Sequence, residues 1–144
     1  IINITSIAGY LGLPYRSIYS ASKGALELLT ESLRMEVKPF DIQITNVAPG
    51  DFSTNIADRR FHAPIIKGSD YENQYQKMLN AINDDVNSGE NPMKMALAIE
   101  NIIQNSNPKI HYKVGSVMQK FSIVLKRILP DKMYEKMLMN HYKM

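Results

Sequence analysis

Tyr19 and Lys23 are the residues whose types and spacing could carry chemistry. They stand four residues apart in Ser17-Ile18-Tyr19-Ser20-Ala21-Ser22-Lys23, at the start of a predicted helix, so their side chains share one face. A free phenol has a pKa of about 10, and an ammonium one turn away favours the phenolate and lowers that pKa. The pair could therefore act as a general acid/base. The same spacing also occurs in helices without such a function, so other residues must decide.

The composition is that of one globular domain. The chain has 144 residues, of which 44% are hydrophobic and 22% charged, and its net charge of +3 is too small to indicate nucleic acid as a partner. It has no cysteine, which excludes disulfides and cysteine-ligated metals and favours a cytoplasmic location. The three histidines are scattered without metal-ligand spacing, so no metal site is predicted. No apolar run reaches the roughly 18 residues of a membrane span.

The first 48 residues predict a strand, a helix and a second strand. The β-branched run at 1–5 is typical of a strand buried in a parallel sheet. A helix follows over 17–38, and the alternating segment 41–48 forms the next strand. A strand–helix–strand unit of this kind is parallel and right-handed. The fold class expected is therefore α/β, with a doubly wound parallel sheet.

The predicted helix 17–38 carries two apolar stripes. One consists of Leu26, Leu29, Leu33 and Val37, and the other of Ala21, Ala25, Leu28 and Met35. Two apolar faces indicate burial against two surfaces. We expect one to be the sheet and the other a neighbouring helix or a second subunit.

The remainder predicts a polar insertion and a helical end. Residues 55–91 form the expected substrate-binding insertion, with a helix over 71–87 whose apolar face is Tyr71, Tyr75, Met78, Leu79, Ile82 and Val86. Further elements are a helix at 92–107, a strand at 109–114 and helices at 117–129 and 131–142. The extension 116–144 is basic and rich in Met. Such helices could touch a membrane surface, but packing on their own domain or on a partner subunit is favoured.

Four features meet at one predicted edge of the sheet. Ser6 follows the first strand and stands thirteen residues before Tyr19, while Pro49-Gly50 follows the second strand, with Thr54 four residues further on. Ligands of a doubly wound sheet bind outside the carboxyl ends of its strands. These residues could therefore line one crevice. The alternatives are a turn or cap role for Ser6 and a helix N-cap for Thr54.

Three segments resemble the short-chain dehydrogenase/reductase (SDR) family. They are Asn3-Ile4-Thr5-Ser6-Ile7-Ala8-Gly9, Tyr19-Ser20-Ala21-Ser22-Lys23, and Asn46-Val47-Ala48-Pro49-Gly50 with Thr54. The resemblance covers residues 1–60 well, and 92–107 and 109–114 resemble the family's last helix and strand. It implies a Rossmann-like fold, NAD or NADP as cofactor, and interconversion of an alcohol with a ketone or aldehyde. The substrate would be a small molecule, with lipophilic compounds included, and the enzyme a homodimer or homotetramer.

The resemblance also implies a role for each matching residue. Tyr19 would exchange a proton with the substrate oxygen, and Ser6 would donate a hydrogen bond to the same atom. Lys23 would hold the nicotinamide ribose and favour the Tyr19 phenolate. The nicotinamide pocket would be shaped by Pro49, Gly50, Phe52 and Thr54.

Two departures from the family pattern stand out. Phe52 takes the place of the usual Ile or Val, and neither the family's glycine-rich turn nor its catalytic Asn is found in the chain. We therefore expect residues 1–144 to be the C-terminal portion of an SDR domain whose cofactor-binding half is absent, and such a fragment to be inactive alone. The alternative from another class is a non-catalytic SDR-like protein with a binding or regulatory role. Retention of Ser6, Tyr19 and Lys23 together argues for the enzyme.

Overall fold

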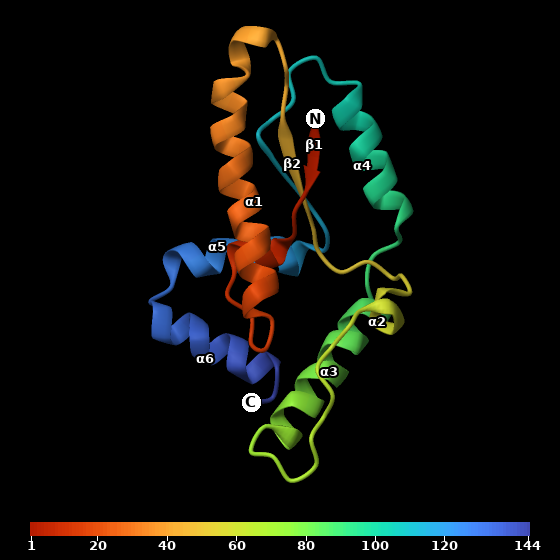
Figure 1. Ribbon diagram of the computed structural model, residues 1–144, viewed down its shortest axis with the longest axis vertical. Helices are drawn as coiled ribbons and strands as arrows, with labels where there is room; N and C mark the ends of the chain where they lie inside the picture. The colour runs from red at the N-terminus through yellow and green to blue at the C-terminus, as the bar shows by residue number, and fades with distance from the viewer.

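A parallel sheet lies between two helices, α1 and α4 (Figure 1). The structure is a computed structural model that describes residues 1–144 apart from the side chain of Ala57. The sheet has the order β1-β2-β3, formed by β1 (Ile2–Ile4), β2 (Thr45–Pro49) and β3 (His111–Val114). Both pairings are parallel, with Ile4 opposite Val47 and Val47 opposite Tyr112. Helix α1 (Ser17–Glu36) covers one face and α4 (Met93–Ile103) the other, which confirms the predicted α/β class.

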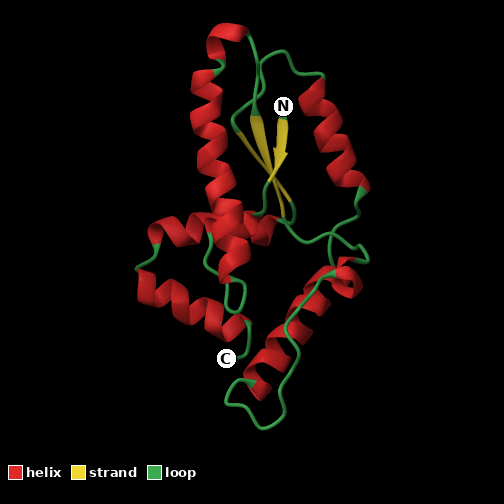
Figure 2. Cartoon of the chain, viewed as in Figure 1, coloured by secondary structure: helices red, strands yellow, loops and turns green.

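The other elements follow the predicted order with shifted ends (Figure 2). They are the 3-10 helices η1 (Ile7–Tyr10) and η2 (Lys38–Phe40) and the helices α2 (Ile56–Arg59), α3 (Glu72–Asn87), α5 (Val117–Ile128) and α6 (Asp131–His141). The predicted strand 41–48 begins only at Thr45, because Asp41 ends η2 in the left-handed region with φ 55°. The short α2 was not predicted, and α4 stops at Ile103, four residues before the expected end.

Helix α1 turns a polar face to the sheet. Its buried side chains are Ser20, Glu27 and Thr30, and Thr30 accepts a hydrogen bond from Asn3 Nδ2 of β1 at 2.8 Å. Leu28 and Met35, by contrast, are 68% and 71% exposed. The stripe that contains Leu28 and Met35 therefore faces away from the sheet, while Leu26, Leu33 and Val37 of the other stripe are half-buried. Hydrogen bonds to strand residues also hold this helix against the sheet.

Three apolar clusters join the elements. Val47, Ile102 and Val114 fill the space between the sheet and α4. A second cluster connects η1 to the C-terminal helices and contains Ile7, Leu11, Ile123 and Tyr134. A third connects α3 to the end of the chain through Met78, Leu79, Ile82 and Tyr142. Helices α5 and α6 therefore pack on their own chain. The predicted face of α3 is buried at Met78, Leu79, Ile82 and Val86, but Tyr71 is 67% exposed and precedes the helix. None of the helices described combines the length and hydropathy needed to cross a bilayer.

Replacement of Ile123 by Ala tests the cluster between η1 and α5. Ile123 is 2% exposed and packs with Ile7 and Leu11, so loss of its side chain leaves a cavity. We expect urea unfolding of the full-length protein to show a free energy of unfolding lowered by about 2–4 kcal/mol. The adjacent Val124 is 47% exposed, and Val124→Ala should change that free energy by less than about 1 kcal/mol. Equal effects of the two substitutions would contradict the packing described.

Candidate functional site

Gly9 and Gly24 place η1 directly against α1. A Cβ added to Gly24 would lie 2.9 Å from the Gly9 carbonyl oxygen, and one added to Gly9 would lie 3.0 Å from the Lys23 carbonyl carbon. The two backbones can approach this closely only because neither residue has a side chain. The contact brings the segment that follows β1, including Ser6, to the helical turn that carries Tyr19 and Lys23.

Tyr19 and Lys23 share the sheet end of α1. The Lys23 ammonium donates a hydrogen bond to the Ile4 carbonyl oxygen at 2.9 Å, two residues before Ser6. Its nitrogen lies 6.0 Å from the centre of the Tyr19 ring, and the Arg16 guanidinium lies 5.2 Å from the same ring. The Tyr19 side chain is 40% exposed. The predicted pair therefore sits together, with two cations near a phenol that a ligand can reach.

Ser6 stands at the junction of β1 and η1. Its hydroxyl oxygen accepts a hydrogen bond from the Ala8 N–H at 3.1 Å and caps η1. The cap that the sequence offered as an alternative is thus present. The cap occupies a lone pair of the oxygen and leaves the hydroxyl hydrogen free to be donated. A role toward a ligand and a role as a cap are therefore compatible.

Pro49 and Gly50 end β2 at the same edge of the sheet. The Gly50 N–H donates to the Val114 carbonyl oxygen at 2.7 Å, and a Cβ on Gly50 would overlap the side-chain amide of Gln119. That amide also donates to Asp51 Oδ2 at 2.5 Å. Burial, and after it the charge of Asp85, raises the pKa of the Asp51 carboxyl. The turn is therefore held by α5, a contact that sequence reasoning missed because 68 residues separate Asp51 from Gln119.

Phe52 and Thr54 extend away from the pair on α1. Phe52 packs against the cluster of Val47, Ile102 and Val114, and its backbone forms a bridge with Glu90. Thr54 is exposed in the connection before α2, whose N-cap residue is Asn55. Thr54 is therefore not the helix cap that the sequence offered as an alternative. Neither side chain shares a described contact with Tyr19 or Lys23.

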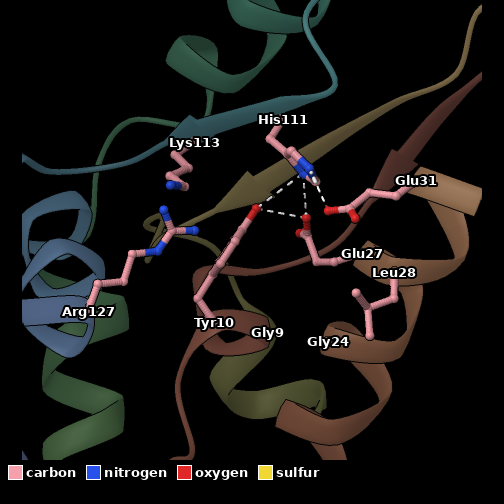
Figure 3. Close-up of a pocket in the computed structure, with 9 residues that line it drawn as sticks. All are labelled: Gly9, Tyr10, Gly24, Glu27, Leu28, Glu31, His111, Lys113 and Arg127. Carbon is pink, nitrogen blue, oxygen red and sulfur yellow. Dashed lines mark hydrogen bonds and ion pairs between the residues drawn. The ribbon is translucent and has the colours of Figure 1, made fainter.

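Beside this edge lies a polar pocket of about 500 Å³ that the sequence did not predict (Figure 3). Its walls come from α1, η1, β3 and α5, and Figure 3 shows Tyr10, Glu27 and His111 pointing toward one another. The Tyr10 hydroxyl donates to Glu27 Oε2 at 2.7 Å. Burial, and after it the hydrogen bond to Glu27, raises the pKa of Tyr10 well above its usual value. The phenol therefore keeps its proton and remains a donor.

The arrangement suits proton transfer to or from a polar ligand. Tyr19 and Lys23 lie together at one end of α1, and Lys23 bonds to the end of the strand that leads into Ser6. In the part of the chain that the structure describes, no group of three or more acidic or histidine side chains could hold a metal ion. A phenol, a hydroxyl and an ammonium can exchange protons and form hydrogen bonds.

Comparison with known proteins gives one family. The family model described as short chain dehydrogenase matches residues 1–64. The chain is similar to 3-ketodihydrosphingosine reductase of Bacteroides thetaiotaomicron, with 39% identity over 136 residues, which cover 94% of this chain and 51% of that protein. The chain spans about half the length of the curated relatives it matches over most of its length.

Solved structures agree on the fold. A short-chain dehydrogenase from Streptomyces avermitilis superposes with a TM-score of 0.62 and 28% identity, covering 94% of this chain and 49% of that one. A second one, from Burkholderia cenocepacia in complex with NADP, has a TM-score of 0.56 at 21% identity and covers 96% of this chain and 46% of its own. The arrangement of strands and helices is thus that of a Rossmann-like sheet.

Substitution of Gly24 by Val tests the close approach of η1 and α1. The added side chain must displace the Gly9 carbonyl, so we expect the free energy of unfolding of the full-length protein to fall by about 1–3 kcal/mol in urea titrations. Gly12 serves as a control, because a Cβ there would meet no atom within 4 Å. A stable Gly24→Val variant would show that the backbones are not in contact.

Proposed function

Because the chain belongs to the short-chain dehydrogenase/reductase family, we propose that the full-length protein is an oxidoreductase that interconverts an alcohol and a ketone or aldehyde. Its acid/base site is Ser6, Tyr19 and Lys23. The observation that carries the proposal is the hydrogen bond from Lys23 to the Ile4 carbonyl, which ties the helix with the phenol to the strand that leads into Ser6.

Tyr19 is the proton donor in reduction and the acceptor in oxidation. Its exposed phenol can reach a substrate oxygen, and the ammonium of Lys23, four residues on, stabilises the phenolate left when the proton moves. Ser6 donates the hydrogen bond that orients the substrate oxygen and stabilises the negative charge developing there. In this proposal the Tyr19 hydroxyl transfers the proton and the Ser6 hydroxyl positions the substrate oxygen.

The residues present fit a nicotinamide cofactor. In the contacts described, Lys23 donates one hydrogen bond, and an ammonium has three donors, so two remain for the ribose hydroxyls. Pro49 and Gly50 end β2 at the same edge, where a nicotinamide ring would sit. NAD or NADP, when bound, supplies or accepts the hydride. The residues that bind its phosphates are assigned to a segment outside these 144 residues.

Phe52 and Thr54 have a smaller part in this proposal than the family resemblance implies. The side chain of Phe52 packs in the core beneath the turn, so it supports the pocket from below. Thr54 is exposed before α2 and shares no described contact with Tyr19 or Lys23. Pro49 and Gly50 therefore remain the better supported cofactor contacts.

A lipophilic substrate is the class we propose. An apolar pocket of about 330 Å³ lies where the insertion 55–91 meets the loop before α1, and Tyr15, Ile65 and Tyr75 are among its walls. The Tyr15 and Tyr75 rings pack with centres 5.4 Å apart. The Bacteroides relative is named as a reductase of a ketodihydrosphingosine, which supports a carbonyl compound with a long apolar part.

Tyr19→Phe tests the acid/base role. The variant keeps the ring and its packing but lacks the hydroxyl, so we expect kcat of the full-length protein to fall about a hundredfold to ten-thousandfold. Cofactor affinity, measured by nicotinamide fluorescence, should change little. Tyr112→Phe is the control, since Tyr112 lies in β3 and its hydroxyl accepts a hydrogen bond from the Lys109 N–H. Turnover near that of the natural protein in Tyr19→Phe would reject the mechanism, and cofactor binding without any turnover of the natural protein would favour a regulatory role.

We also propose that the full-length protein is a homodimer or homotetramer with α1 in the interface. The support is the outward apolar face of α1, where Ile18, Leu28 and Met35 are more than two-thirds exposed. An exposed patch of this kind marks an interaction surface.

Met35→Lys should weaken that assembly, because it places a charge in an apolar contact. Light scattering of the full-length protein should give a dimer or tetramer for the natural chain and a larger monomer fraction for the variant. Ile128→Lys is the matched control, at 68% exposure on α5 against 71% for Met35. A natural protein that is monomeric at all concentrations tested would contradict the assignment.

A further inference from the structure

The Glu27 carboxylate joins five segments of the chain. Glu27 lies one turn after Lys23 on α1 and is 5% exposed. One of its oxygens accepts from the Thr5 hydroxyl, and the other is 2.7 Å from the Tyr10 hydroxyl and 2.8 Å from His111 Nδ1. Asn46 Nδ2 donates to the second oxygen at 3.1 Å. A single buried carboxylate therefore connects α1 to the end of β1, to η1, to β2 and to β3.

Each bonded residue stands next to a group of the proposed site. Thr5 precedes Ser6, and Tyr10 ends the 3-10 helix that Ser6 caps. Glu27 follows Lys23 by one helical turn, and Asn46 comes three residues before Pro49. A shift of Glu27 would thus be transmitted to both sides of the site. The Gly9–Gly24 contact sets how close η1 and α1 lie, and the Glu27 bonds set how they are aligned.

His111 lies between two carboxylates. Its Nδ1 is 2.8 Å from Glu27 Oε2 and its Nε2 is 3.0 Å from Glu31 Oε1. An ionised carboxylate only accepts hydrogen bonds, and a neutral imidazole has only one N–H. Both contacts are hydrogen bonds at the same time only when the ring is protonated. The geometry therefore matches an imidazolium held by two carboxylates one turn apart on α1.

Solvent protons can reach this histidine. The His111 side chain is 30% exposed and that of Glu31 is 46% exposed, and both line the pocket of Figure 3. The other charged and titratable groups that face the pair are Tyr10 from η1, Lys113 from β3 and Arg127 from α5. Lys113 lies 4.8 Å from the centre of the Tyr10 ring. Lys113 and Arg127 add positive charge around the ring, and Glu27 and Glu31 add negative charge.

We propose that Glu27 and protonated His111 form a positioning pair that aligns Ser6 with Tyr19 and Lys23, so that deprotonation of His111 loosens this alignment. The inference rests on the proposed function for its catalytic consequence only. Neither residue touches the reacting atoms. As the pH rises, the ring loses one N–H and with it one of the two carboxylate bonds, so the segment 5–10 becomes freer to move away from α1.

The first measurement is independent of activity. Hydrogen exchange of the backbone amides of residues 5–11 in the full-length protein, corrected for intrinsic rates, is followed from about pH 5 to about pH 9. We expect protection in this segment to fall about tenfold or more as His111 loses its proton, which is the effect of losing one charge-assisted hydrogen bond. In His111→Asn the protection should be low and independent of pH.

His141→Asn is the matched control. His141 also lies beside a carboxylate, with Nε2 3.4 Å from Asp85 Oδ2, but on α6. It should leave the exchange of residues 5–11 unchanged. The proposal would be overturned if protection of residues 5–11 in His111→Asn fell with rising pH as it does in the natural protein. It would also be overturned if His141→Asn lowered this protection as much as His111→Asn does.

Glu31→Gln provides a second variant at a half-exposed position, where folding is not at risk. It removes one of the two carboxylates in contact with the ring, so the pH dependence of protection in residues 5–11 should differ from that of the natural protein. An unchanged pH dependence would contradict the role of Glu31.

The second measurement is the pH profile of kcat and KM. In the natural protein kcat should follow the same transition as exchange, with little change in KM for the cofactor, and this transition should be absent in His111→Asn. A general loss of stability would instead lower kcat at every pH. If the natural protein shows no nicotinamide-dependent turnover, the proposed function fails while the exchange data still report on the pair. If turnover is present and exchange of residues 5–11 does not depend on pH, the positioning pair fails alone.

Discussion

The backbone contact between Gly9 and Gly24 is the constraint on which the rest of the site depends. With a Cβ at Gly24 only 2.9 Å from the Gly9 carbonyl, the separation of η1 and α1 has almost no tolerance. The ammonium of Lys23 reaches the Ile4 carbonyl at 2.9 Å because the helix lies this close to the strand end. The distance between the proposed acid/base groups therefore depends on Gly9 and Gly24, which have no side chain.

The inner face of α1 follows from the same constraint. Ser20, Glu27 and Thr30 are buried there, where a helix on a sheet ordinarily places apolar residues. Most buried polar groups have a hydrogen-bond partner, and Glu27 and Thr30 find theirs on the strands and on η1, whereas the Ser20 hydroxyl has none among the contacts described. Hydrogen bonds have direction, whereas apolar contacts tolerate sliding. The helix is thus fixed along its axis as well as against the sheet, which a site built across two elements requires.

The sequence predicted well what is encoded locally. The periodicity of residues 71–87 indicated the helix and most of its buried face. The parallel pairing of β1 and β2 brings Ser6 and Pro49-Gly50 to one edge of the sheet, and the meeting of Tyr19 with Ser6 stays a prediction. The helical period of α1 did not predict that its buried side chains are the polar Ser20, Glu27 and Thr30. The bonds of Glu27 could not be predicted either. His111 stands 84 residues away in the chain, and a lone histidine in a short strand gives no signal of its partner. The one local signal is that Glu27 stands three residues before Thr30, so that two polar side chains share a face of the helix.

The neighbouring strands β2 and β3 are connected through residues 50–110, which hold the insertion and α4. The entropy lost in closing a chain segment grows only with the logarithm of its length, so doubling this connection would cost only about 0.6 kcal/mol. The pairing of Asn46 with His111 joins β2 to β3 and so fixes both ends of this connection. A change in the length of the connection would therefore cost little free energy of folding. Evolution could therefore redesign the insertion, which is the proposed substrate-binding region, while leaving the frame of the proposed acid/base site intact.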